Sequence, residues 1–76
     1  MDELARITVD PQVMGGQACV RGMRVKAAMI LDLLAAGRSR VEILEAYPYL
    51  EPEDIDAVLR YAAWRAREFE LPTRSA

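Results

Sequence analysis

The chain has 76 residues, with one Cys, no His and a formal net charge of −2. A chain of this length forms one domain with a small core. A lone Cys excludes an internal disulfide, and without His a zinc site of the usual Cys and His type is also excluded. The cysteine usage, together with a polar start that lacks a long apolar run, predicts a cytoplasmic protein without a signal peptide or a membrane anchor.

The first third of the domain, residues 6–25, is predicted to form a small β ribbon. Runs of β-prone residues occur at 7–9, at 19–21 and, after Gly22, at 23–25. Gly15 and Gly16 lie between the first two runs and signal a turn, because glycine reaches the positive φ angles that a tight reversal needs. We therefore expect two or three short strands.

A central helix is predicted over residues 26–36. Its apolar side chains recur at helical spacing, at Ala27, Ile30, Leu33 and Leu34, with Met29 and Leu31 on the flanks. A helix that is apolar over most of its circumference is buried, and this one is too short to cross a bilayer. Gly37 follows it and provides the left-handed residue that commonly ends a helix.

Two further helices are expected, at about 39–47 and 52–70. Ser39 and Glu42 have the spacing of a capping box, which starts the first of them, and Pro48 ends it. The second begins with a proline among acids, which suits a first helical turn. The prediction is thus a single domain over residues 1–72, followed by a frayed tail at 73–76.

The helix at 52–70 carries apolar residues on two faces. One face is the predicted core stripe, made of Ile55, Val58, Leu59, Ala62, Ala66 and Phe69. Ala57, Tyr61 and Trp64 lie on nearly the opposite side and are the predicted protein interface, because Tyr and Trp are enriched at the energetic centres of interfaces. The alternative is that Tyr61 and Trp64 cover the ribbon of the same chain. A small core that gains from a partner subunit also favours a homodimer.

Positive charge is concentrated in the middle of the chain. The candidate nucleic-acid-binding residues are Arg21, Arg24, Lys26, Arg38 and Arg40, whereas residues 42–56 contain six acids and no base. The guanidinium groups of Arg21 and Arg24 are suited to phosphates or to a partner's carboxylates. The alternative for these two is an internal ion pair with Asp10 or a contact with a helix-end carbonyl.

The residue inventory disfavours catalysis. The sequence has no His and no nucleophile paired with a base, and no phosphate-binding loop follows its glycines. Cys19 is predicted to be a buried apolar residue rather than a nucleophile. We therefore predict a protein that is not an enzyme and has no catalytic, cofactor or metal site, with a site made of carboxylates alone as the least favoured alternative.

Several motifs occur together at matching spacings. They are Gly15-Gly16, Arg21-Gly22-Met23-Arg24, Gly37, a short helix led by Ser39, Tyr47-Pro48-Tyr49-Leu50 and Glu53-Asp54-Ile55. Over roughly residues 6–65 this pattern resembles the bacterial domain-of-unknown-function family 433. Two positions differ from the family's pattern, since Ala18 stands where proline is usual and Met23 where threonine is usual. The loop before Cys19 is therefore expected to be less rigid.

The resemblance implies a mainly α fold with a small N-terminal β ribbon, in which three helices form a helix-turn-helix-like bundle of the winged-helix or homeodomain-like kind. It also implies an antitoxin of a bacterial toxin-antitoxin pair, whose usual neighbour is a PIN-like nuclease toxin. Our leading hypothesis is therefore a non-enzymatic antitoxin that binds and masks this toxin, with repression of its own operon as a second expected role. The expected partners are a second copy of the chain, the cognate PIN-like toxin and operator DNA, with no membrane and no small-molecule substrate.

Two other functions remain open from the sequence. The main alternative is a free-standing DNA-binding transcriptional regulator without a toxin, and the third is a structural adaptor. Docking by the start of the helix at 52–70 is disfavoured for any DNA-binding role, because Glu51, Glu53, Asp54 and Asp56 would oppose the phosphates.

Overall fold

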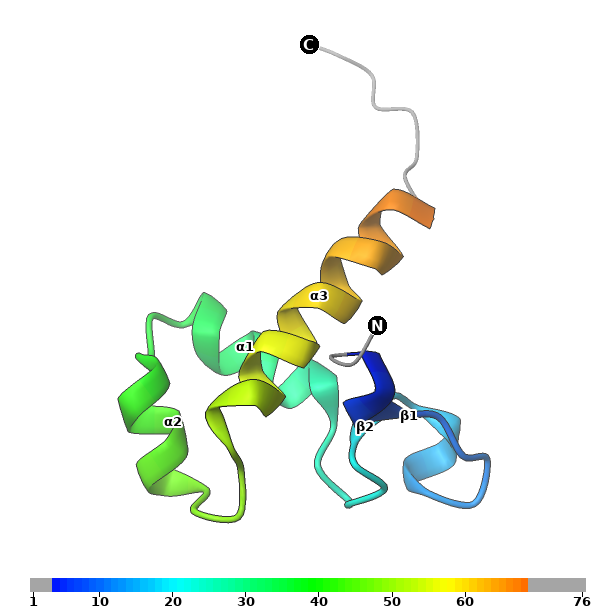
Figure 1. The fold of residues 1–76 in the computed structure, drawn as a ribbon, viewed down its shortest axis with the longest axis horizontal. Coiled ribbons are helices and arrows are strands. Elements are labelled where there is room, and N and C mark those ends of the chain that lie inside the picture. The colour runs from blue at the N-terminus through cyan, green and yellow to red at the C-terminus, as the bar shows by residue number, and fades with distance from the viewer. Residues whose placement is uncertain (1–3, 69–76) are drawn as a thin grey trace, which may run out of the picture.

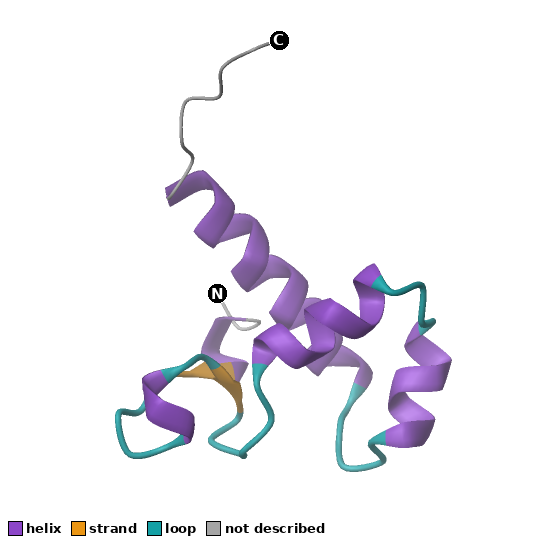
Figure 2. Ribbon diagram, turned by 180° about the vertical axis from the view of Figure 1, so that it is seen from behind, coloured by secondary structure: helices purple, strands orange, loops and turns teal. Residues whose placement is uncertain are grey.

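The computed structural model describes residues 4–68, and in this range three α-helices follow a short antiparallel ribbon. The elements are the 3-10 helix Leu4–Arg6, β1 (Ile7–Thr8), the 3-10 helix Met14–Gly16, β2 (Cys19–Val20), α1 (Ala27–Ala35), α2 (Arg40–Ala46) and α3 (Pro52–Glu68). Figures 1 and 2 place α2 and the ribbon on opposite sides of α1, with α3 crossing it. The predicted fold, mainly α with a small N-terminal ribbon, is confirmed.

The ribbon has two paired strands, with Ile7 opposite Val20 and Thr8 opposite Cys19. The third expected strand, at 23–25, does not form as a strand. The chain reverses directly after β2, and only a hydrogen bond from the N–H of Val20 to the carbonyl of Val25 at 3.0 Å and an isolated bridge between Cys19 and Lys26 join the returning segment to β2. Arg21 and Gly22 both have positive φ angles, 47° and 71°, as the central residues of a type I′ turn require. The turn is closed by a hydrogen bond from the backbone N–H of Met23 to the carbonyl of Val20 at 2.8 Å.

The helix boundaries follow the predicted capping signals. Gly37 has a φ of 90° and donates its N–H to the carbonyl of Leu34 at 3.0 Å, while Arg38 donates to Leu33 at 3.0 Å, which is the Schellman pattern. At the start of α2, the Ser39 hydroxyl accepts from the N–H of Glu42 at 3.1 Å, and the Glu42 carboxylate accepts from the N–H of Ser39 at 2.8 Å. The predicted capping box is therefore present.

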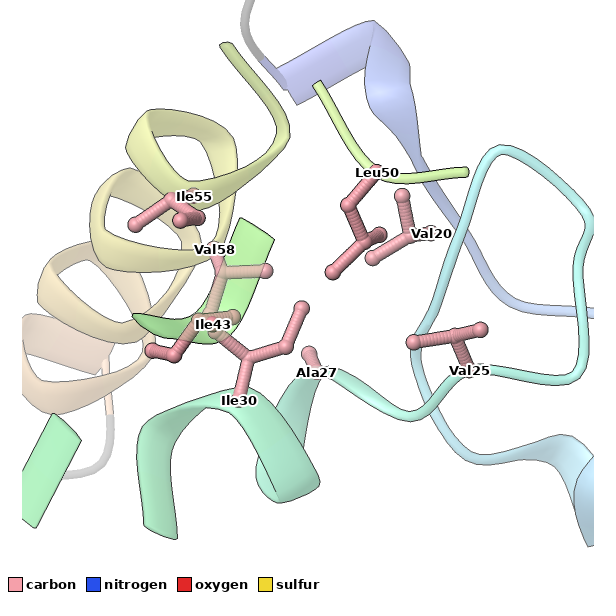
Figure 3. Close-up of a cluster of buried hydrophobic side chains, with 8 residues drawn as sticks. All are labelled: Val20, Val25, Ala27, Ile30, Ile43, Leu50, Ile55 and Val58. Atoms are coloured by element: carbon pink, nitrogen blue, oxygen red, sulfur yellow. The ribbon is translucent and has the colours of Figure 1, made fainter. Parts of the chain in front are cut away.

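The core lies where the ribbon, α1, α2 and α3 meet. Figure 3 shows its buried side chains, which are Val20, Val25, Ala27, Ile30, Ile43, Leu50, Ile55 and Val58. Ile30, Ile43 and Ile55 come from three different helices and are almost completely buried. Each such side chain contributes about 1.5 to 3 kcal/mol when it is transferred from water. These contacts hold the three helices in one bundle.

Two expectations about burial were wrong. In α1 only Ala27 and Ile30 are buried, and Leu33 and Leu34 are half-buried, because the packed side of the helix is narrower than its apolar side. In α3 Leu59 is 40% exposed and Ala66 is also exposed, although the prediction placed both in the core with Ile55 and Val58. Each helical residue is rotated by about 100° from the one before, so Leu59 turns outward where Val58 turns inward.

Some predicted boundaries lie outside the described residues. These are the end of the third helix at 70, the core residue Phe69 and the tail at 73–76. Within residues 4–68, no helix combines the length and the apolar character that a membrane span requires.

Candidate protein interface

Asp54 is the centre of an ion-pair network that joins the ribbon to α3. Its side chain is fully buried in the first turn of α3. Arg21 donates from Nε to Oδ1 at 3.0 Å and from Nη2 to Oδ2 at 2.8 Å, and Arg6 donates from Nη1 to Oδ1 at 2.8 Å. The backbone N–H of Glu51 donates to Oδ2 at 2.8 Å, so Asp54 also caps the helix.

These donors keep Asp54 ionised despite its burial. Burial alone would raise the pKa of the carboxyl group. The hydrogen bonds from Arg21, from the Glu51 backbone and from Arg6 outweigh this effect and lower the pKa to about 2. The network is thus a permanent structural feature at neutral pH rather than a titrating site.

The network removes Arg21 from the candidate nucleic-acid surface. Besides Asp54, the Arg21 guanidinium donates to the carbonyl of Tyr49 at 3.0 Å. The internal ion pair was the alternative interpretation of this residue, but its acid is Asp54 and not Asp10, which instead accepts the N–H of Gln12 at 2.9 Å. No local sequence pattern indicates a partner 33 positions away.

The remaining four candidate bases do not form one continuous surface. Arg40 pairs with Asp56 of α3 at 2.7 Å. Arg24 and Lys26 precede α1, whereas Arg38 follows it, and a nine-residue helix separates its ends by about 13 Å. Among residues 4–68, Arg24, Lys26 and Arg38 make no ion pair, and of these only Arg24 and Lys26 lie on one short segment. That segment is therefore the part of the predicted surface that is best placed to meet a phosphate.

A groove of about 550 Å³ lies between the ribbon, α1 and the C-terminal half of α3. We call it the Trp64 groove, and its lining residues are Val9, Gly16, Gln17, Ala18, Ala27, Ala28, Leu31, Tyr61, Trp64 and Arg65. Trp64 is 42% exposed and Val9 is 62% exposed. The rings of Tyr61 and Trp64 are 6.1 Å apart and tilted by 41°. Two predicted interface residues therefore lie together at an exposed apolar concavity.

Ala57, the third predicted interface residue, does not contribute to this groove. Its side chain is completely buried, because Ala57 lies in the first half of α3, which packs against the rest of the domain. Tyr61 is half-buried and contacts the core, as the intrachain alternative expected, whereas the following turn that carries Trp64 leaves the body of the protein. Figures 1 and 2 both show this half of α3 projecting beyond the other elements.

The charges around the groove limit the kind of partner that it can bind. None of its lining residues is acidic, and Arg65 lies on its wall. Arg60 and Arg67 lie about one helical turn before and after Trp64. The groove is thus suited to an apolar side chain flanked by acids. Sequence analysis missed Val9 and Leu31 as lining residues, since they are distant from Trp64 in the chain.

Comparison with known proteins places this geometry in a family. Residues 7–62 match the family model described as a protein of unknown function, DUF433. The uncharacterized protein y4eO of Sinorhizobium fredii (strain NBRC 101917 / NGR234) is 38% identical over 66 residues, which represent 82% of this chain and 30% of that protein.

A solved structure agrees with the sequence match. The crystal structure of a DUF433 member from Anabaena variabilis ATCC 29413 has a TM-score of 0.77 and 30% identity, over 83% of this chain and 62% of that one. The chain therefore spans under a third of the curated relative and about three fifths of the crystallised protein. Since the family model covers well over half of the chain and the fold agrees, this protein belongs to the DUF433 family.

Proposed function

We propose that the chain is a non-enzymatic antitoxin that binds and masks a PIN-like nuclease toxin through the Trp64 groove. The observation that carries the proposal is the exposure of Trp64 at an apolar concavity. Large aromatic side chains in such positions are typical energetic centres of protein interfaces. The toxin as partner is what the resemblance to the family implies, and the groove is the surface that supports it.

Masking a toxin requires a binding surface and no catalytic group. Within residues 4–68, the only buried charged side chain is Asp54, and all its contacts are internal. Cys19, in β2, is buried, and its thiol donates to the carbonyl of Gln17 at 3.4 Å. These features support a role in binding rather than in catalysis.

Co-expression with the product of the adjacent reading frame tests the proposal. We expect the tagged chain to capture that product and to relieve its toxicity. Trp64→Ala should weaken capture by about 30-fold or more, because truncation of a central aromatic removes about 2 kcal/mol or more of binding free energy.

Val41→Ala is the matched control. Val41 is as exposed as Val9 but lies on α2, outside the groove, so its truncation should leave capture unchanged. Circular dichroism of both variants establishes that they fold. Equal capture by wild type and folded Trp64→Ala, or no capture by the wild type, would contradict the proposal.

A DNA-binding regulator is the second candidate function. It is favoured by Arg24 and Lys26, which have no ion-pair partner within residues 4–68 and precede α1 on the same short segment. Two bases support weak, non-specific attraction to phosphates rather than recognition of a sequence. Repression of its own operon would accordingly need more than one copy of the chain on the DNA.

A further inference from the structure

The outward face of α3 carries two apolar residues between charges of opposite sign, with Arg60 beside them. Leu59 and Ala63 are both exposed and lie one turn apart, with Asp56 a turn before them and Arg67 a turn after them. Residues spaced by three and four positions share one side of a helix, so these four form a continuous row. We call this row the outer stripe.

The outer stripe and the Trp64 groove are separate surfaces. A shallow hollow of about 300 Å³ is lined by Asp56, Leu59, Arg60 and Ala63, and none of these residues lines the groove. The two hollows thus share no lining residue, although Arg67 lies near both surfaces.

We propose that the outer stripe is the contact between two copies of this chain, which pair with their α3 helices antiparallel. Parallel pairing would place Asp56 against Asp56 and Arg67 against Arg67. Antiparallel pairing instead places the acid of each copy beside the base of the other. Such a contact uses the same surface twice about a two-fold axis and closes as a dimer.

The spacing along α3 is consistent with a single two-fold axis. The midpoint of Leu59 and Ala63 is position 61, from (59 + 63)/2, and that of Asp56 and Arg67 is position 61.5, from (56 + 67)/2. The two midpoints differ by half a residue, which is about 0.8 Å along a helix. One axis therefore brings the apolar residues together at the centre and forms both charge pairs at the ends.

Asp56 can accept the partner's arginine without losing its own. Its Oδ1 lies 2.7 Å from Nη2 of Arg40, and 46% of the Asp56 side chain remains exposed. A carboxylate has several acceptor positions, and Asp54 in the same helix accepts two arginines at once. The half of α3 that carries Arg67 projects from the body, so a second helix can approach it (Figure 1).

Charge reversal tests this arrangement by sedimentation equilibrium of the whole chain. The wild type is expected to dimerise between micromolar and hundreds of micromolar concentration. Asp56→Arg and Arg67→Asp should each weaken dimerisation by about tenfold or more, because like charges then meet at both ends. An equimolar mixture of the two variants should form heterodimers, and the variant with both changes should dimerise again.

Glu45→Arg, an exposed charge reversal on α2, is the matched control and should leave dimerisation unchanged. Arg67→Asp keeps the Arg40–Asp56 pair, so it remains informative even if Asp56→Arg affects folding. A monomeric wild type over this range, or single variants that dimerise like the wild type, would overturn the proposal, as would a mixture that stays monomeric. Toxin capture is measured separately, with Trp64→Ala, so that a failure of the dimer proposal can be distinguished from a failure of the toxin proposal.

Discussion

Arg21 and Asp54, 33 positions apart in the sequence, meet through two hydrogen bonds, from Nε to Oδ1 at 3.0 Å and from Nη2 to Oδ2 at 2.8 Å. Arg21 adopts a left-handed backbone conformation, with a φ of 47°, which is unfavourable for a residue other than glycine. The bidentate contact offsets this strain and fixes the turn of the ribbon against the start of α3. A tight turn and a helix cap are thus stabilised by one ion pair.

Loss of the Asp54 carboxylate should destabilise the fold strongly. We expect Asp54→Asn to lower the free energy of unfolding by about 2 to 4 kcal/mol, because a buried acceptor of several charged donors is replaced by a neutral amide. A domain of this size has about 5 kcal/mol in total. Urea denaturation measures the change, and Asp56→Asn, in the half-exposed pair with Arg40, should cost only about 0.5 kcal/mol. Similar losses in the two variants would contradict the role of Asp54.

The same carboxylate makes stability depend on acid pH. Its pKa is about 2 in the folded chain, against 3.8 for the unperturbed group, so between these values the unfolded state binds more protons. The contribution of Asp54 is therefore complete above about pH 4 and is lost as the pH falls towards 2. Urea melts at several pH values should show a shallower acid dependence for Asp54→Asn than for the wild type. Parallel curves would exclude Asp54 as a source of the dependence.

Local signals in the sequence were sufficient for much of the fold. Gly37 and the Ser39 capping box predicted the end of α1 and the start of α2, because capping depends on residues within one turn. The Arg21–Asp54 pair was not predictable in this way, since any of several acids was an equally suitable partner.

Burial along α1 gives a further test, in which Ile30 and Leu33 are compared. Ile30→Ala should lower the free energy of unfolding by about 2 to 5 kcal/mol, the usual range for emptying a fully buried site. Leu33→Ala should lower it by about 1 kcal/mol, because its side chain is half-buried and part of its area already faces water. Both changes are measured by urea melts. Equal losses would mean that Leu33 is as buried as its helical spacing suggested.

Helical periodicity predicted which residues share the aromatic face of α3, but not how deeply each of them is buried. Ala57, Tyr61 and Trp64 share one side of the helix, yet Ala57 is buried while Trp64 is exposed. The difference arises because the neighbouring elements cover only the first part of α3, and helical spacing carries no information about where a neighbour ends. The walls of the groove, Val9 and Leu31, depend on the same tertiary arrangement.

The last prediction concerns which side chains contact the phosphates if the protein binds DNA. Replacement of both Arg24 and Lys26 by Ala should weaken binding to operator and random duplex alike, because phosphate contacts carry no sequence information. Each lost phosphate contact changes the slope of log affinity against log salt concentration by about 0.9. The slope measured for the double variant should therefore be shallower by about 1.8. Titrations at two or more salt concentrations measure both effects.

Arg40→Ala is the control for this measurement. Its guanidinium is held by Asp56, so we expect its removal to change the salt slope by less than loss of either free base. Docking through the start of α3 predicts the opposite pattern, in which Glu53→Ala alters base preference while Arg24 and Lys26 matter little. That outcome would assign DNA recognition to an acidic helix end, where Glu51, Glu53 and Asp56 oppose the phosphates. If the wild type binds neither duplex at low salt, alone or with the product of the adjacent reading frame, operon repression is excluded and toxin masking stands as the proposed role.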